Sequence, residues 1–593
     1  MRTLLVAQRS GAVSELNSRR VDWLWPLILL VALAVTGCAG PSTVPSAQDA
    51  RPPNPGQIKT LVLAQINAVK SYSPWDFSNT SGGGTTLTEI HTMGLTVQDN
   101  GGNQAPRIAT KMPSVNDGSI SIPADGRMVT TWQIRPDVTW QDGTPFTTED
   151  IAFTFAMYSR PDLSLNSSAS RFMERVDVMD QFTARITWKT TYYLALDLNQ
   201  SAFWMFPKHL LGEGLEESNA ALTQRSYFTT DYVHLGPFRV TSWGQGENQV
   251  FERHPGYFLG TPKLDRVIIK TIVNPLSIQT ELKAGSIDMA AEKTLPTDAY
   301  ADLRDEWSKS GEGTVLSRQD NWRYIRFQFD PAFARPIELS QDVRLRRGLL
   351  LGWDREALRE LIFPGFDRSL TNGDTFMQSS DPRAAIVGEP FAPFPYDSNR
   401  AAQELAGGGW TRAADGRLLN REGQQVQIEI RATPAEAKDL AVVAEGWRRL
   451  GAEVIEYVPP EALNRENAFK SQFPATNATA QGSGDGIFVG FDSRQSAVAD
   501  SNWIGNNRGH YMNPALDRLI DQLSASLDIT EQAHILRQEA DLLAADLPAL
   551  PAYFRLSSTS IRKTVRGPIY EDFPATQGSG NTIARNAHLW DKA

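Results

Sequence analysis

The sequence is poor in the residues that usually carry metal or thiol chemistry. It holds one cysteine, Cys38, and seven scattered histidines with no pair at metal-ligand spacing. A single cysteine excludes an intramolecular disulfide. The motifs H-E-x-x-H and G-x-S-x-G are absent, and Ser560-Ile561-Arg562-Lys563 fits S-x-x-K without the companion motifs of that enzyme class. The sequence therefore predicts no catalytic residue, no metal site and no cofactor.

A basic excess is also missing. The chain has 58 basic and 68 acidic residues; without the predicted signal, which holds four arginines, Glu15 and Asp22, 54 and 66 remain, a net charge of −12. A nucleic-acid partner would require a basic face, so this charge argues against one. The glycine-rich segment 481–486 lacks the spacing of a phosphate-binding loop, which argues against nucleotide binding.

Long apolar runs are scarce as well. The run from Trp23 to Val35 follows four arginines, is too short for a confident membrane span, and ends just before Gly37-Cys38. This pattern resembles a bacterial lipobox, which implies cleavage after Gly37 and diacylation of Cys38. We expect a signal peptide over 1–37 and, because 38–57 is rich in Pro, Ser and Ala, a flexible tether there.

The remaining chain, of more than 500 residues, is too long for one hydrophobic core and should form at least two lobes. Its most informative stretch is 236–290. Strand-like segments at 249–253, 264–273 and 287–290 surround a turn at His254-Pro255-Gly256 and a helix from Ser277 to Ala284, with Gly285 placed to end it. This order predicts a βαβ crossover in a mainly parallel sheet.

Further segments of the chain have equally definite patterns. Residues 135–150 read as a strand, a turn at Asp142-Gly143 and a helix capped by Thr147 or Thr148. Residues 342–363 predict two helices interrupted at Gly352-Trp353-Asp354, and 517–547 predict a helical pair split near 528–530. A second strand–helix–strand pattern lies over 426–458, which indicates a second α/β lobe.

These blocks, in this order, resemble bacterial extracellular solute-binding protein family 5, the substrate-binding lipoproteins of peptide and nickel ABC importers. The resemblance runs from Ile58 to about the C-terminus. It implies an α/β, two-lobed type II periplasmic-binding-protein-like fold of cluster C, with an extra subdomain in the first lobe. Lobe I would comprise 58–324 and 552–593, and lobe II 325–551, joined near 321–327 and 547–554.

Ligand contacts in such a fold are expected at aromatic walls and at strand ends that face the cleft. Six residues are candidates. Trp322 and Tyr324 lie beside the expected hinge, whereas Phe491 and Asp492 end a predicted strand over 487–491, with Trp503 and Tyr511 following. In peptide-binding members of the family an aspartate at a corresponding strand end receives the ligand's α-ammonium group; Asp492 lies near that position, and a loop or capping role stays open for it.

The resemblance implies a monomeric receptor outside the cytoplasm, anchored to the membrane by lipid at the cell surface or in the periplasm. It would close on a solute, first of all a peptide, and deliver it to the transmembrane subunits of an ABC permease. An oligosaccharide or a nickel or haem chelate is an alternative ligand. Two other functions stay open on the sequence: an envelope hydrolase and a sensor that presents its ligand to a partner.

Overall fold

The structure is a computed structural model that describes residues 58–74, 84–99, 103–163, 167–244, 248–433, 437–460, 462–568 and 583–593. The chain divides into two compact units, Met1–Gln57 and Ile58–Ala593, and every described residue belongs to the second. The predicted signal peptide, the tether and Cys38 lie outside the described residues. Within these ranges, no helix is long and apolar enough to cross a membrane.

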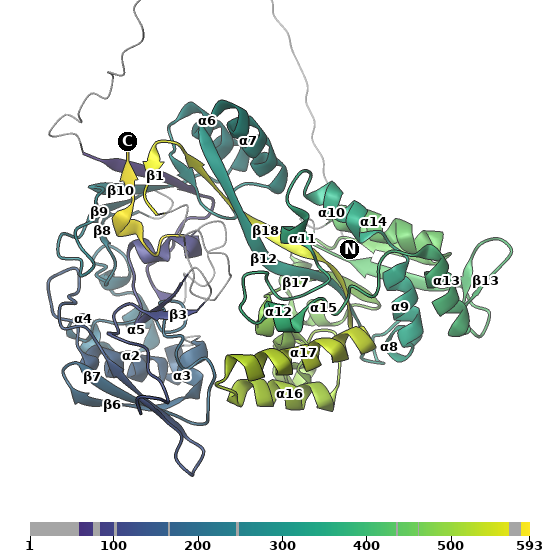
Figure 1. The fold of residues 1–593 in the computed structure, drawn as a ribbon, viewed down its shortest axis with the longest axis horizontal. Helices are drawn as coiled ribbons and strands as arrows, with labels where there is room; N and C mark the ends of the chain where they lie inside the picture. The colour runs from purple at the N-terminus through teal and green to yellow at the C-terminus, as the bar shows by residue number, and fades with distance from the viewer. Residues whose placement is uncertain are drawn as a thin grey trace, which may run out of the picture. The chain divides into compact units, whose positions relative to one another are not determined.

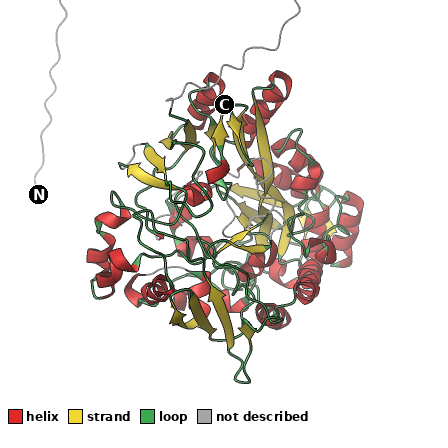
Figure 2. Ribbon diagram, turned by 60° about the vertical axis from the view of Figure 1, so that its left-hand side comes forward, coloured by secondary structure: helices red, strands yellow, loops and turns green. Residues whose placement is uncertain are grey.

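A ten-stranded mixed sheet forms the centre of this unit (Figure 1). In order across the sheet, its strands are β16 (Glu453–Tyr457), β15 (Gln427–Arg431), β17 (Thr476–Gln481), β12 (Gly313–Phe327), β18 (Ala549–Arg562), β11 (Met289–Ala290), β1 (Thr60–Gln65), β10 (Arg266–Thr271), β9 (Gln249–Arg253) and β8 (Phe238–Ser242). Figure 2 shows helices packed around these strands. The predicted α/β class is confirmed.

Two long antiparallel strands, β12 and β18, join the two halves of the sheet (Figure 1). At one end β18 pairs with β11, whereas at the other end β12 pairs with β17. The pairing of β12 with β18 is irregular between Gln319 and Trp322, and Trp322 and Tyr324 already pack in the hydrophobic cluster of lobe II. The side-chain packing therefore changes from lobe I to lobe II at this irregularity.

The stretch 236–290 folds as its pattern predicts. Strands β10 and β11 both pair in parallel with β1, and the helix α6 (Pro275–Ala284) connects them, which confirms the βαβ crossover. Asn274 rather than Ser277 caps the helix, because its side chain accepts the amide of Leu276. Gly285 ends the helix with φ 81°, a left-handed conformation that suits glycine.

The extra subdomain of lobe I has its own sheet and its own hydrophobic cluster. Its strands, in order, are β4 (Ile120–Ser121), β5 (Met128–Gln133), β7 (Thr183–Trp188) and β6 (Met173–Asp180). Helix α2 (Thr148–Tyr158) begins after Thr147, whose amide donates to the Asp150 carboxylate at 3.0 Å. The motif 135–150 is thus part of the scaffold.

Lobe II contains the second predicted crossover, because β15 and β16 are parallel and helix α14 (Ala437–Arg449) connects them. The predicted helices over 342–363 are α9 (Val343–Leu351) and α10 (Arg355–Ile362). Two glycines of this segment allow close packing. A Cβ at Gly348 would lie 2.7 Å from Leu405, and one at Gly352 would lie 2.3 Å from Leu450.

The remaining elements are short, with the exception of α7 and of the pair α16 and α17. The other helices are α3 (Ser168–Phe172), α4 (Lys208–Leu211), α5 (Asn219–Thr223), α7 (Thr297–Ser310), α8 (Glu338–Gln341), α11 (Arg368–Thr371), α12 (Ala384–Val387), α13 (Ser398–Gly407), α15 (Asn467–Ser471), α16 (Pro514–Ala525) and α17 (Ile529–Asp546). The other strands pair as β2 (Thr96–Gln98) with β3 (Gln104–Pro106), β13 (Thr411–Arg412) with β14 (Leu418–Leu419), and β19 (Val565–Arg566) with β20 (Asp591–Lys592).

The prediction of a strand over 487–491 was wrong. The strand is β17, eleven residues earlier, and residues Gly484–Gly490 form a 3-10 helix. The polar sequence of β17 gives little sign of a strand, yet it lies between β15 and β12, whose ladders determine its conformation. Phe491 and Asp492 therefore do not end a strand of lobe II.

Candidate ligand-binding site

A cavity of about 330 Å³ lies in lobe II along β17, beginning at the carboxyl end of β15. This volume is at the low end of the range for small-molecule sites. Its lining consists of Arg326, Arg431, Thr433, Asn464, Phe469, Lys470, Asn477, Ala478, Thr479, Ala480, Gln481, Asn506, Arg508 and Arg555. Five of these side chains are basic, and none of the described lining residues is acidic. The cavity therefore offers a positive environment to a ligand.

Arg326 lines this cavity and is almost fully buried, with an exposed fraction of 6%. It lies two residues beyond Tyr324 on the same face of β12. Its Nη2 donates to the Tyr324 hydroxyl at 3.1 Å, and Nη1 donates to the Asn506 carbonyl at 3.4 Å. Its Nε is buried and has no hydrogen-bond partner among the described residues. One donor of the guanidinium, the Nε–H group, thus has no partner among the described residues.

Arg508 and Lys470 contribute two further positive charges. Among the described residues, Arg508 donates only to the carbonyl and the side-chain oxygen of Asn467, both at the long distance of 3.5 Å. Burial, and after it the charge of Arg326, lowers the pKa of Arg508. Burial, and after it the charge of Arg508, lowers the pKa of Lys470. Arg326 therefore repels Arg508, and Arg508 repels Lys470.

Arg431 differs from these three cations because it has a carboxylate partner within the protein. Its Nη2 lies 3.0 Å from Glu429, and its Nη1 donates to the Phe469 carbonyl at 3.1 Å. Its guanidinium also lies over the rings of Phe469 and Tyr457, 4.3 and 5.3 Å from their centroids. We therefore assign Arg431 a structural role at the cavity wall.

The structure brings four of the six predicted ligand residues together, as a buried aromatic cluster. The Trp322 ring stacks on Tyr324 at 4.8 Å, and Phe491 lies 5.8 Å from Tyr324 and 6.4 Å from Tyr511. Trp322 and Tyr324 have no exposed surface. Tyr324 nevertheless borders the cavity, because its hydroxyl donates at 2.7 Å to Gln481, a lining residue.

The other two predicted residues have local roles. The Asp492 carboxylate accepts the Arg494 amide at 2.9 Å and pairs with the Arg494 guanidinium at 2.8 Å, which is a capping geometry. Trp503 is half-buried, and its ring lies 6.0 Å from Phe333. None of the six predicted side chains lines the cavity described above. As ligand contacts they stay a prediction.

A carboxylate does follow the end of β17, namely Asp485, but it is already engaged. Arg383 donates to it at 3.2 Å and pairs with Asp381 at 2.8 Å. Tyr193, from lobe I, adjoins this network: burial, and after it the Asp485 charge, raises the pKa of its hydroxyl. The Tyr193 amide also donates to the Ser524 carbonyl at 3.1 Å. These contacts connect lobe I with lobe II near the end of β17.

No sequence pattern indicates Arg326, Lys470 and Arg508 as a group, because they come from three distant segments. Arg326 alone has a sequence signal, because it lies two residues after the candidate Tyr324 and so shares a strand face with it. Among the described residues, no group of three His, Cys, Asp or Glu side chains is arranged to hold a metal ion.

The sheet, divided between two halves that share two long strands, belongs to a mixed α/β fold that matches cluster C periplasmic binding proteins over at least 90% of this chain. The sequence model described as "Bacterial extracellular solute-binding proteins, family 5 Middle" matches residues 105–488, so the chain belongs to this family. The family consists of non-catalytic substrate-binding proteins of ABC transporters, which confirms that the chain is not an enzyme.

Curated relatives and solved structures agree with this assignment. Oligopeptide-binding protein AppA of Bacillus subtilis is 22% identical over 444 residues, which cover 74% of this chain and 76% of AppA. Its structure with a nonapeptide has a TM-score of 0.64 and 19% identity and covers 91% of this chain and 100% of that chain. NikZ of Campylobacter jejuni, in complex with Ni(L-His), has a TM-score of 0.67 and 22% identity, and covers 90% and 99%. At these identities the structures show the fold alone.

Proposed function

We propose that this chain is a lipid-anchored receptor that captures a peptide outside the cytoplasm, between lobes I and II, and delivers it to an ABC permease. The observation that carries the proposal is the pair β12 and β18, which belongs to both halves of the sheet and is irregular between Gln319 and Trp322. Small backbone rotations at such a position can open and close two lobes around a ligand.

Two further observations support this function. The contact of Tyr193 with the Asp485 network supports a closed arrangement, in which the proposed lobes touch beyond the two strands. Peptide is the preferred ligand class because the Bacillus subtilis relative is an oligopeptide-binding protein. A ligand-presenting sensor would use the same site, and ligand-dependent stimulation of a reconstituted permease distinguishes the two.

Ligand capture is tested by adding peptide mixtures to the mature protein without its lipid. We expect the radius of gyration from small-angle scattering to decrease and the melting temperature to rise. Ligand at about one hundred times Kd should stabilise the folded state by about 2.7 kcal/mol. The proposal fails if peptide, sugar and metal-chelate panels all leave both quantities unchanged.

The lipid anchor is tested separately by Cys38→Ser. We expect the wild-type protein to fractionate with membranes and the variant to be released, because acyl chains contribute about 0.8 kcal/mol for each buried CH₂. Ser42→Ala, four residues further along the predicted tether, is the matched control and should stay with the membranes. Membrane retention of the Cys38→Ser protein would contradict the anchor.

A further inference from the structure

The three cations of the cavity, Arg326, Lys470 and Arg508, share an unusual property: among the described residues, none of them has a carboxylate within ion-pair distance. Two other buried arginines among the described residues do have one. Arg318 pairs with Glu292 at 2.6 Å, and Arg323 pairs with Asp439 at 2.7 Å. The cavity therefore gathers three positive charges that no carboxylate of the described residues neutralises.

Such an arrangement is unfavourable unless a ligand completes it. A buried charge without a partner is costly, and like charges at close range add to that cost. Burial, and after it the charge of a neighbouring arginine, lowers the pKa of Lys470 and of Arg508. The buried Nε of Arg326, without a partner among the described residues, is a donor that a bound acceptor could satisfy.

We propose that the cavity binds a group of the ligand that carries two negative charges, and that Arg326, Lys470 and Arg508 recognise it together. The inference rests on the proposed function and specifies its substrate class. Two sources supply this chemistry: the C-terminal acidic residue of a peptide, with two nearby carboxylates, and a phosphoryl group. Guanidinium groups suit either one, because their donors match the oxygens of carboxylates and phosphates.

The size of the cavity agrees with this assignment. A volume of about 330 Å³ accommodates one end of a larger ligand. Asn477 and Gln481 add neutral polar groups to the same wall, so the bound group would meet hydrogen-bonding partners as well as charges.

The test compares wild type with Arg508→Gln and Lys470→Gln, using glutarate and inorganic phosphate as probes of the cavity. Each anion should raise the melting temperature of wild type more than chloride at equal ionic strength does. Both variants should bind the effective anion roughly ten- to hundredfold more weakly. Without anion they should melt at the wild-type temperature or above it, because each substitution removes a repulsive charge.

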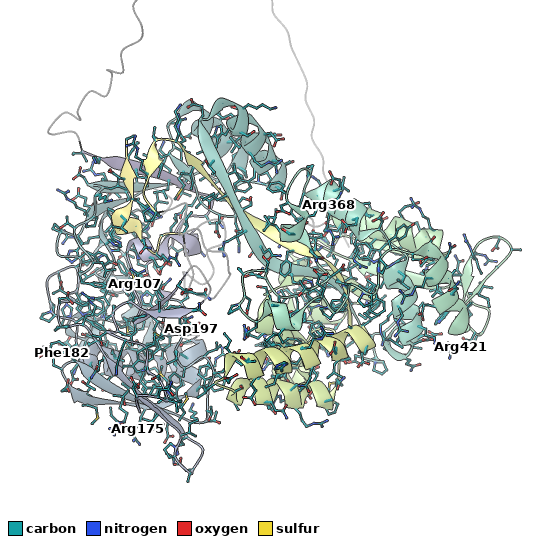
Figure 3. The ribbon with its side chains drawn as sticks, viewed as in Figure 1. Arg107, Arg175, Phe182, Asp197, Arg368 and Arg421 are labelled. Carbon is teal, nitrogen blue, oxygen red and sulfur yellow. The ribbon has the colours of Figure 1, made fainter. Side chains whose placement is uncertain are left out.

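Arg368→Gln is the matched control. It removes one positive charge from lobe II at an exposed position that does not line the cavity (Figure 3). It should leave anion binding unchanged. The inference is overturned if neither anion stabilises wild type more than chloride does, or if both cavity variants bind the anions as wild type does.

Two peptides that differ only in a C-terminal glutamate or glutamine separate this inference from the proposed function. Tighter binding of the glutamate peptide, lost in Arg508→Gln, supports the peptide source. Equal binding of both peptides by wild type and variant overturns the inference and leaves the receptor function standing. Phosphate binding that depends on Arg508, without binding of either peptide, supports the anion site through its phosphoryl source and contradicts the peptide ligand.

Discussion

Replacing Glu292 with alanine is expected to lower the free energy of unfolding by about 3–5 kcal/mol, because it leaves a buried arginine without its carboxylate. Glu292 follows β11 and is fully buried. Arg318 of β12 donates to it through Nε at 2.7 Å and through Nη2 at 2.6 Å, and Ser557 of β18 donates at 3.0 Å. One carboxylate thus ties together three adjacent strands on the lobe I side of the irregularity.

Urea unfolding followed by tryptophan fluorescence measures this loss, since the chain has fifteen tryptophans. Glu312→Ala is the matched control, because Glu312 pairs with Lys563 near the same end of β12 but is exposed, and it should change little. Equal effects of the two substitutions would contradict the role of Glu292.

The same carboxylate predicts a pH dependence. Burial alone would raise the pKa of Glu292, but the charge of Arg318 and its hydrogen bonds outweigh burial and lower the pKa below its ordinary value. A lowered folded-state pKa means that this stabilisation is present above the ordinary pKa of glutamate. It is lost as the pH falls through the folded-state value. Glu292→Ala should therefore flatten the acid side of the stability profile.

Asp439→Ala is expected to have an effect of similar size, about 3–5 kcal/mol, on the lobe II side. Asp439 lies in the first turn of α14 and is buried. Arg323 of β12 donates to it at 2.7 Å, and the Tyr553 hydroxyl of β18 donates at 2.8 Å. The carboxylate therefore fixes helix α14 to the two strands that join the halves of the sheet.

The measurement is again urea unfolding, with two comparisons. Asp439→Asn keeps the shape of the side chain but removes the charge, so it should be destabilising as well. Glu445→Ala, on the exposed side of the same helix, removes only the pair with Arg449 and should change little. If Asp439→Ala were as mild as Glu445→Ala, the pair with Arg323 would not anchor α14.

Much of the fold could be predicted from the sequence because its signals are local. Residues 342–363 were expected to form two helices interrupted at Gly352-Trp353-Asp354 and do so, since the Asp354 carboxylate accepts the Ala357 amide and caps the second helix. Gly285 was expected to end α6 and does so in the left-handed conformation. Such features depend on a few neighbouring residues, so a single sequence is enough to find them.

The part that failed depended on distant neighbours. Residues 476–481 form a strand because β15 and β12 lie on either side, whereas residues 487–490 belong to the 3-10 helix Gly484–Gly490. Phe488 packs there against Phe376, at 5.1 Å, so burial did not require a strand. Hydrophobic character alone therefore predicted the strand end at the wrong residues.

The candidate site could not be predicted from the sequence for a related reason. Aromatic residues near the hinge were expected to form ligand walls, yet Trp322 donates its Nε1 to the Gly373 carbonyl at 3.0 Å inside the core. The cavity is distinguished by three cations that have no carboxylate partner among the described residues. A single sequence does not show which cations lack such a partner. Arg508 and Arg318 look alike in the sequence, although one lacks a carboxylate partner among the described residues and the other has Glu292.

Native mass spectrometry of the freshly purified protein, compared with Arg508→Gln, tests the central claim most directly. The account predicts that wild type retains one solute, that the released solute is a peptide with a C-terminal acidic residue or carries a phosphoryl group, and that Arg508→Gln retains much less of it. A retained solute without negative charge, held equally by both proteins, would contradict the account.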